Sequence, residues 1–245
     1  MNTFLNFLGY AKPWQIGFQT AGSPVMEGIQ WMHNFLLIII GVIGVFVIAL
    51  ILYTLWKFRE NKNKVPNNIT HNVKLEVVWT LIPTIIVLAI MVPSVKLIMF
   101  SEITPKEDMT LKVNAHTWYW SYEYPEDQIS FESRIIPDKD IDKSKGQLRL
   151  LSVDNPVVVP VGKVVKVLVT SGDVIHSFAV PSLGVKRDAV PGRVNETWFK
   201  IKKPGKYYGQ CSELCGILHG FMPIEIHAVT EKEYKQWISK QKKDA

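Results

Sequence analysis

Five side chains that can bind a metal ion or a proton lie close together near the C-terminal end of the chain, in GQCSELCGILHGFM (residues 209–222). They are Cys211, Glu213, Cys215, His219 and Met222, and the two cysteines are the only ones in the chain. Thiolates, imidazoles and thioethers are soft or intermediate ligands, the combination that selects copper. The spacing C-x3-C-x3-H-x2-M therefore favours a copper site over isolated packing residues.

Two other interpretations of the cysteine pair stay open on these residues alone. In an oxidising compartment, Cys211 and Cys215 could form a disulfide. A thioredoxin-like redox pair is less favoured, because the spacing is C-x3-C rather than C-x2-C and no βαβ pattern surrounds it.

A copper site needs a further nitrogen ligand, and His176 in VTSGDVIHSFAVPSLG is the best candidate. We expect it to follow a strand, as in cupredoxins, where one histidine comes from an early strand and the other ligands from one loop near the C-terminus. A histidine satisfied within the core is the alternative. Two thiolates, two imidazoles and one thioether suit two coppers bridged by both sulfurs, and a rigid site of this kind moves single electrons.

The chain beyond residue 100 alternates apolar and polar residues with period two, the pattern of half-buried strands. Turn-rich pieces such as PDKD and KKPGK separate the predicted strands, which cover residues 111–124, 147–153, 156–171, 196–201 and 223–229. Several short strands without helical segments between them favour an antiparallel sandwich or barrel. Thr230 and Glu233 fit a capping box that opens a short C-terminal helix, and Ser23-Pro24 fits the start of another helix.

Two long uncharged segments, from Phe35 to Trp56 and from Val77 to Val95, precede this β-rich part. At about 1.5 Å per residue, each is long enough to cross a hydrocarbon layer of about 30 Å as a helix. Two buried helices of a soluble core are the disfavoured alternative, because such helices are seldom apolar on all sides over this length. A cleaved signal peptide is also disfavoured, since the first segment starts late and no basic stretch precedes it.

The loop between the two segments predicts their orientation. The residues before the first segment contain only Lys12 as a basic residue, whereas the loop contains Lys57, Arg59, Lys62, Lys64 and Lys74. The positive-inside rule places this loop in the cytoplasm or the mitochondrial matrix. We therefore expect an N-terminal segment with a membrane hairpin in residues 1–100 and an exported domain in residues 101–245. That domain is nearly neutral, so the net charge of +6 does not require a nucleic acid partner.

The chain resembles subunit II of the haem–copper cytochrome c oxidases from Pro13 to the predicted C-terminal helix. The resemblance rests on the two-segment hairpin and on the motifs HTWYWSYEY, LLSVDN, DVIHSFAVPSLGVKRDAVPGRVNET and YYGQCSELCGILHGFMPIEI. It implies a two-helix transmembrane hairpin followed by an all-β cupredoxin-like Greek-key barrel with a short C-terminal helix. It also implies a bacterial plasma membrane or mitochondrial inner membrane, with the copper domain on the periplasmic or intermembrane-space side.

The resemblance also implies metal ligands. The family's ligands to its dinuclear copper A centre fall on His176, Cys211, Glu213 through its main-chain carbonyl, Cys215, His219 and Met222. The Glu213 carboxylate is implied to bind a magnesium ion at the boundary with subunit I, and a solvated loop carboxylate is the alternative. A hard oxygen ligand beside two thiolates makes sense only if it points elsewhere.

Two further roles are implied for residues outside the ligand loop. Trp118 is the expected point at which electrons enter from cytochrome c, and Glu76 is expected near the mouth of a proton pathway of subunit I. Strand alternation puts Trp118 on one face with Trp120, Tyr122 and Tyr124, where core packing is the alternative role. For Glu76, the alternative is a carboxylate that merely reaches the membrane surface.

Acidic residues could form a docking patch for a basic partner such as cytochrome c, because complementary charge speeds encounter. Each could equally be a solvated turn carboxylate. The candidates are Glu123, Glu126, Asp127, Asp154 and Asp173.

The expected function is therefore the electron-accepting subunit of a cytochrome c oxidase, which passes electrons from cytochrome c to haem in subunit I for oxygen reduction and proton pumping. Of six histidines, two are committed to copper, so we expect no haem in this chain. A Sco-type copper chaperone would need one span and a thioredoxin-like α/β pattern. A quinol-oxidase subunit II would lack the cysteines, and nitrous oxide reductase would not be expected to carry the hairpin.

Overall fold

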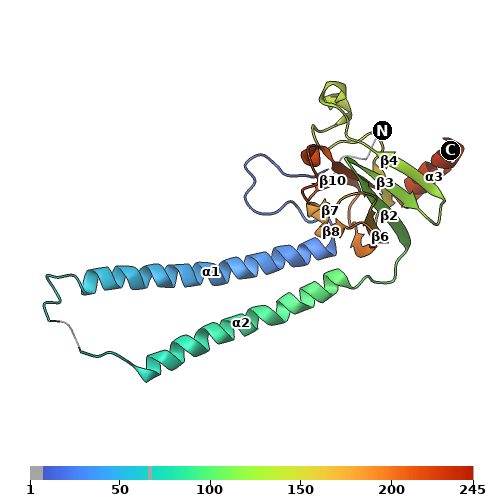
Figure 1. Cartoon of the computed structure of the whole chain (residues 1–245). Helices are drawn as coiled ribbons and strands as arrows, with labels where there is room; N and C mark the ends of the chain where they lie inside the picture. The colour runs from blue at the N-terminus through green and yellow to red at the C-terminus, as the bar shows by residue number, and fades with distance from the viewer. Residues whose placement is uncertain (1–7, 66–67, 245) are drawn as a thin grey trace. The chain divides into compact units, whose positions relative to one another are not determined.

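The computed structural model describes residues 8–65 and 68–244 and contains two long helices and a β domain (Figure 1). Contacts divide the chain into two compact units, one formed by residues through Ile29 together with Met99–Ala245 and the other by Gln30–Ile98. The predicted division at residue 100 assigns the whole N-terminal segment to the helical part. The contacts instead group its described residues, through Ile29, with the β domain.

The unit Gln30–Ile98 consists of most of helix α1 (Pro24–Lys57) and helix α2 (Val73–Glu102). Both are long and apolar enough to cross a membrane, and the most apolar stretch of each has no buried residue. Helices that are apolar on all sides and enter no protein core require an apolar surrounding. The predicted pair of transmembrane helices is confirmed, and Pro83 and Pro93 lie inside α2 without ending it.

The ends of these helices belong to the unit that contains the β domain. Ser23 caps α1, since its Oγ accepts a hydrogen bond from the main-chain N–H of Met26 (3.1 Å) and donates one to the carbonyl of Leu183 (2.6 Å). In the first turns of α1, Val25 packs with Trp198. Two ion pairs also join helix ends to strands or their connections: Lys202–Glu27 and Arg187–Glu102.

The β domain is a sandwich of two sheets. One sheet has the strand order β5 (Val157–Pro160), β11 (Pro223–Val229), β10 (Gly205–Cys211), β7 (His176–Val180), β8 (Val185–Ala189), and β1 (Leu8–Gly9) pairs with β10. The other has the order β4 (Ile129–Ser133), β3 (Tyr119–Tyr124), β2 (Met109–His116), β6 (Val164–Ser171), β9 (Asn195–Lys200). Short 3₁₀ helices lie in the connections: η1 (Asp138–Asp140), η2 (Lys143–Lys145), η3 (Pro181–Leu183) and η4 (His219–Phe221).

The sequence pattern predicts an antiparallel sandwich or barrel, but the two sheets also contain parallel strand pairs. Among the described strands, β1–β10, β5–β11 and β2–β6 are parallel pairs. After β4 the chain passes to the first sheet at β5 and returns to the second at β6, which runs beside β2 in the same direction. The predicted all-β sandwich itself is confirmed.

The core lies between the two sheets and is built from the apolar side of each strand. On β3, Trp120, Tyr122 and Tyr124 are buried while the residues between them face outward, as strand alternation requires. The C-terminal helix α3 (Glu231–Asp244) begins with the predicted capping box. Thr230 N–H donates to the Glu233 carboxylate (2.9 Å), and Glu233 N–H donates to the Thr230 hydroxyl (3.4 Å).

Three predicted strands differ from the structure. Residues 111–124 form two strands, β2 and β3, joined by a turn at Thr117–Trp118, and residues 156–171 form β5 and β6. Residues 147–153 are a turn rather than a strand, apart from one bridge from Val153 to Ile135. The Ser152 hydroxyl accepts a hydrogen bond from Leu148 N–H (3.0 Å), and Leu150 has a φ of 63°. Local side-chain hydrogen bonds of this kind compete with sheet pairing.

Candidate metal centre

The cysteine-rich stretch forms a closed loop between β10 and β11. Cys211 is the last residue of β10, and its N–H donates to the carbonyl of Met222 (3.0 Å), which directly precedes β11. The loop is also tied to β7, because Ser212 N–H donates to the carbonyl of Ser177 (3.0 Å). We call residues 211–222 the ligand loop.

The ligand loop and β7 bring soft donor atoms together. The Sγ atoms of Cys211 and Cys215 lie 3.8 Å apart, and both cysteines are free. His176 Nδ1 lies 3.9 Å from the Cys211 sulfur, and His219 Nδ1 lies 3.6 Å from the Cys215 sulfur. One imidazole nitrogen therefore stands beside each sulfur, and the donor atoms of His176, Cys211 and Cys215 all lie within 4.8 Å of one another.

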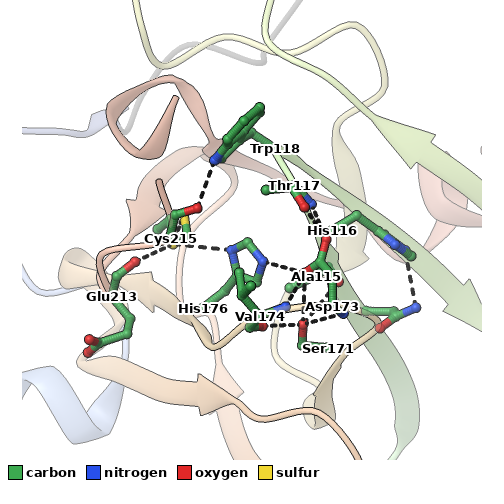
Figure 2. Close-up of polar contacts among 12 residues, drawn as sticks. Ala115, His116, Thr117, Trp118, Ser171, Asp173, Val174, His176, Glu213 and Cys215 are labelled. Atoms are coloured by element: carbon green, nitrogen blue, oxygen red, sulfur yellow. Dashed lines mark hydrogen bonds and ion pairs between the residues drawn. The ribbon is translucent and has the colours of Figure 1, made fainter. Parts of the chain in front are cut away.

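Two further donor groups border these atoms. The main-chain carbonyl of Glu213 accepts a hydrogen bond from the Cys211 thiol (3.3 Å), while its side chain is exposed and points away from the sulfurs (Figure 2). Met222 is almost fully buried at the base of the loop. The main-chain carbonyl of Glu213 thus faces the centre, whereas its carboxylate is free to contact a group outside the centre.

Burial controls the protonation of the centre. Removal from water, followed by the neighbouring Cys211, raises the pKa of the Cys215 thiol to about 12. Since metal ions bind thiolates, a metal entering the site must displace this proton, and its own charge stabilises the thiolate. His176 is fully buried and His219 is half-buried, so the site excludes most solvent.

His176 is held from behind by a carboxylate. Its Nε2 lies 2.8 Å from Asp173 Oδ1, so Nε2 carries the proton and Nδ1 faces the sulfurs with its lone pair. Burial of Asp173 acts to raise its pKa, but hydrogen bonds from Thr117 and His176 outweigh this and hold the pKa well below the ordinary range. The carboxylate is therefore ionised at neutral pH.

Trp118 does not lie on the strand where alternation put it. It lies in the turn before β3, half-buried, and its Nε1–H donates to the carbonyl of Cys215 (3.0 Å; Figure 2). A Cβ at Gly216 would lie 3.1 Å from the indole ring, and Gly216 has a φ of +114° that favours glycine. The indole therefore lies against the ligand loop at the edge of the core, against which it also packs.

The five candidate docking carboxylates fall into two groups. Glu123, Glu126 and Asp127 lie at or beyond the end of β3, whereas Trp118 precedes its start, a separation of about 20 Å along the strand. Asp127 also pairs with Lys242 of α3 (3.5 Å). Asp173 and Asp154 lie at the other end, the first against Thr117 and the second accepting from the N–H of Arg134 (2.7 Å).

Sequence reasoning missed two features at the Trp118 end of the sheet. Glu132 is exposed there and pairs with Arg134 (2.7 Å), whose guanidinium stacks 3.6 Å above the Tyr119 ring. On the ligand loop, Leu214 and Ile217 are 78% and 90% exposed, which makes an apolar surface beside the centre. The alternation of β4 could have indicated that Glu132 points outward, but its place opposite Ser121, three residues beyond Trp118, depends on the strand register.

Glu76 lies far from these residues in the chain, in the first turn of α2. Asn72 caps this helix by accepting from Leu75 N–H (3.2 Å), and Glu76 is half-buried. An acidic residue in the first turn also complements the helix dipole, so this position alone does not select a functional role.

Fold and site together define a class of protein. Its members are anchored in a membrane and carry a cupredoxin-like β domain with a candidate cysteine–histidine metal centre. Two family models match the chain: "Cytochrome C oxidase subunit II, transmembrane domain" over residues 11–97 and "Cytochrome C oxidase subunit II, periplasmic domain" over residues 109–229. The chain belongs to the cytochrome c oxidase subunit II family. It is thus a membrane-bound subunit of a haem–copper oxidase.

Curated relatives agree with this assignment over nearly the whole chain. "Probable cytochrome c oxidase subunit 2" of Rickettsia conorii is 50% identical over 240 residues, covering 98% of this chain and 76% of the relative. "Cytochrome c oxidase subunit 2" of Chondrus crispus is 46% identical over 251 residues, covering 98% of each.

Solved structures match the β domain. The periplasmic domain of subunit II of cytochrome oxidase from Bradyrhizobium japonicum is 53% identical with a TM-score of 0.54, covering 58% of this chain and 99% of that one. A subunit II domain solved as a mixed disulfide intermediate with a thioredoxin-like protein is 52% identical with a TM-score of 0.50, covering 58% and 96%.

Proposed function

We propose that this chain accepts electrons one at a time from cytochrome c at a dinuclear copper A centre and passes them to haem in subunit I. The observation that carries the proposal is the meeting of two buried free thiols, each beside an imidazole nitrogen, where the ligand loop meets β7. The proposed copper ligands are His176, Cys211, the Glu213 carbonyl, Cys215, His219 and Met222.

The donor set fits two copper ions better than one. A mononuclear site needs one thiolate, whereas here two sulfurs lie 3.8 Å apart and can bridge a pair. His176 and His219 then serve one ion each, with Met222 and the Glu213 carbonyl as weaker ligands. Bound there, two coppers would supply reversible one-electron transfer between cytochrome c and haem.

The protein's own contribution is to keep this site rigid and largely dry. His176 is fully buried and Met222 is 1% exposed, so little water reaches the metal position. The loop is closed by the main-chain hydrogen bond between Cys211 and Met222 and is tied to β7 at Ser177. A fixed ligand frame supports fast electron transfer, because little has to rearrange when the charge changes.

Trp118 is the proposed point at which electrons enter. Its half-buried indole donates a hydrogen bond to the carbonyl of Cys215, one residue of the ligand set. An electron that enters at the indole can therefore reach the metal position through one hydrogen bond to the Cys215 carbonyl and the covalent bonds of Cys215. The apolar side chains of Leu214 and Ile217 are exposed on the same loop and are suited to contact with a partner protein.

Several further assignments belong to the same proposal. The exposed Glu213 carboxylate binds magnesium together with residues of subunit I, and Glu76 lies near the mouth of a proton pathway of that subunit. Of the predicted docking carboxylates, Asp154 lies at the end of the sheet that carries Trp118, and Glu123, Glu126 and Asp127 lie at the far end of β3. The basic loop between the two spans faces the cytoplasm or matrix, so the copper domain faces the periplasm or intermembrane space.

Metal analysis of the full chain in detergent tests the central claim. We expect two coppers per chain after loading of the reduced protein, and an electron paramagnetic resonance spectrum of one unpaired electron shared by two copper nuclei. In the intact oxidase, Trp118→Phe should leave this spectrum unchanged and slow electron transfer from cytochrome c. One copper per chain, or no copper binding by the reduced cysteines, would overturn the proposal.

A further inference from the structure

Asp173 has contacts that a docking carboxylate does not need. Its side chain is only 32% exposed, and both carboxylate oxygens are occupied by the protein. Oδ1 accepts from Val174 N–H (2.6 Å) and from His176 Nε2–H (2.8 Å). Oδ2 accepts from Thr117 N–H (2.6 Å) and from the Thr117 hydroxyl. Figure 2 shows the carboxylate between the His176 ring and the Thr117 turn.

The parallel pairing of β2 and β6 creates this arrangement. Ala115 is paired with Ser171, and the same offset two residues later puts Thr117 beside Asp173, where both strands have ended. The two connections that leave these strands lead to different parts of the site. One reaches Trp118 at once, and the other reaches His176 at the start of β7.

Asp173 therefore closes a ring of contacts around the metal position. From Asp173, one path runs through His176, whose Nδ1 faces the Cys211 sulfur at 3.9 Å. The other runs through Thr117 to its neighbour Trp118, which donates to the Cys215 carbonyl at 3.0 Å. A carboxylate that accepts from the far nitrogen of a ligating histidine fixes its tautomer and ring orientation.

We propose that Asp173 is a positioning residue that holds the ligand His176 and the turn carrying Trp118 in one fixed frame. This inference rests on the proposed copper function and replaces the docking role expected for Asp173. The physical basis of the proposal is that the Asp173 carboxylate accepts hydrogen bonds both from His176 and from Thr117 in the turn before Trp118. The distance between the indole and the ligand set is thereby fixed before any partner binds.

Asp173→Asn tests this role with little change in size. His176 and Thr117 meet different oxygens of the carboxylate, and a side-chain amide keeps only one of the two as an acceptor, so it can accept from only one of these residues. In the full chain we expect about a 10–100-fold loss of copper affinity, measured by competition with a chelator, and an altered copper hyperfine pattern. In the intact oxidase, the first-order electron-transfer rate at saturating cytochrome c should fall as well.

Asp138→Asn is the matched control, because it removes the same charge from an exposed carboxylate paired with Arg149. It should keep the wild-type copper affinity, spectrum and saturated rate. Should Asp173→Asn fail to fold, Thr117→Val tests the turn alone: the saturated rate should fall while copper affinity stays within about threefold of wild type. An unchanged rate in Thr117→Val would overturn the proposed frame.

The outcomes separate this inference from the function on which it rests. If the wild-type chain fails to bind a copper pair, the proposed function is wrong. If wild type binds the pair and Asp173→Asn keeps its affinity, spectrum and saturated rate, only weakening association with cytochrome c, then Asp173 is a docking residue and the inference is wrong.

Discussion

At the scale of single residues, the candidate centre depends on how strongly each donor is held. Cys211 ends β10 and Cys215 lies in the closed ligand loop. His176 begins β7 and is hydrogen-bonded to Asp173, and Met222 is buried at the base of the loop. The expected roles differ in the same order: the thiolates bridge, the imidazoles bind one ion each, and the thioether is a weak ligand. Substitutions should therefore have graded rather than uniform effects.

Met222→Leu and Cys215→Ser should separate two of these roles. Met222→Leu should keep two coppers and shift their reduction potential, because a weak axial ligand tunes the potential more than it holds the metal. Cys215→Ser removes a bridging sulfur and should abolish the shared-electron spectrum. Copper counting and redox titration of the full chain check both outcomes, and equal metal loss in the two variants would contradict the assignment.

At the scale of elements, the contacts between the first sheet and its connections decide how the site is supported. Glu225 on β11 is almost fully buried, lies 2.7 Å from His227 Nε2 and accepts a hydrogen bond from Val153 N–H (3.0 Å). It also lies 3.5 Å from Lys206 of β10. This carboxylate fastens the turn at residues 147–153 to the strands that carry the ligand loop.

The pH dependence of stability should report on Glu225. Burial acts to raise its pKa, but the hydrogen bond with His227 and the nearby charges outweigh this and lower the pKa below the ordinary value of 4.5. The folded state then gains stability above pH 4.5 and loses it as the pH falls through the folded pKa. Glu225→Gln should lower the melting temperature of the full chain in detergent at pH 7.

The difference between wild type and Glu225→Gln should shrink as the pH falls from 4.5 through the lower pKa of the folded state, because the wild-type carboxyl then becomes neutral in the folded protein too. Near-ultraviolet circular dichroism during heating measures it. A difference that stays constant from pH 7 to pH 3 would show that the ionised form of Glu225 does not stabilise the fold.

At the scale of the whole molecule, the surfaces at the two ends of strand β3 differ in what they offer to a partner protein. The Trp118 end carries Asp154 and lies beside the exposed apolar residues of the ligand loop, and Glu132 lies opposite Ser121, two residues closer to Trp118 than Glu123 is. The other end carries Glu123, Glu126 and Asp127. A basic partner that delivers electrons to Trp118 must approach the first end, since electron transfer weakens steeply with distance.

Glu132→Gln and Glu123→Gln form a matched pair for this question, because each residue is exposed and paired with one basic side chain. Glu132→Gln should slow association with reduced cytochrome c more than Glu123→Gln does, and should flatten the dependence of the rate on salt. Stopped-flow mixing at several ionic strengths measures both. A larger effect of Glu123→Gln would favour the predicted patch at the far end of β3.

The orientation of the whole chain in the membrane is tested by labelling. A membrane-impermeant thiol reagent applied from the periplasmic or intermembrane-space side should tag a cysteine placed at Lys242 and miss one placed at Asn63. The reason is the basic loop between the spans, which the positive-inside rule keeps on the inner side. Labelling of the Asn63 probe from the outer side would reverse the topology.

The sequence by itself determined the features that depend on neighbours in the chain. Two uncharged runs specify the membrane helices, period-two alternation specifies most strands, and Thr230 with Glu233 specifies the start of α3. The ligand loop is also local, since its donor residues lie within twelve positions. Such features follow from helix and strand periodicity or from short spacing, so the residues could be identified before any tertiary contact was known.

Only the tertiary structure decided the contacts that bridge long stretches of chain. Thr117 meets Asp173 across 56 residues and Trp118 meets Cys215 across 97. The first contact depends on the register of the parallel β2–β6 pair, and the second on where the ligand loop folds relative to the β2–β3 turn. A carboxylate looks the same in sequence whether it faces solvent or a ligating histidine, because sheet register, not composition, decides which group it meets.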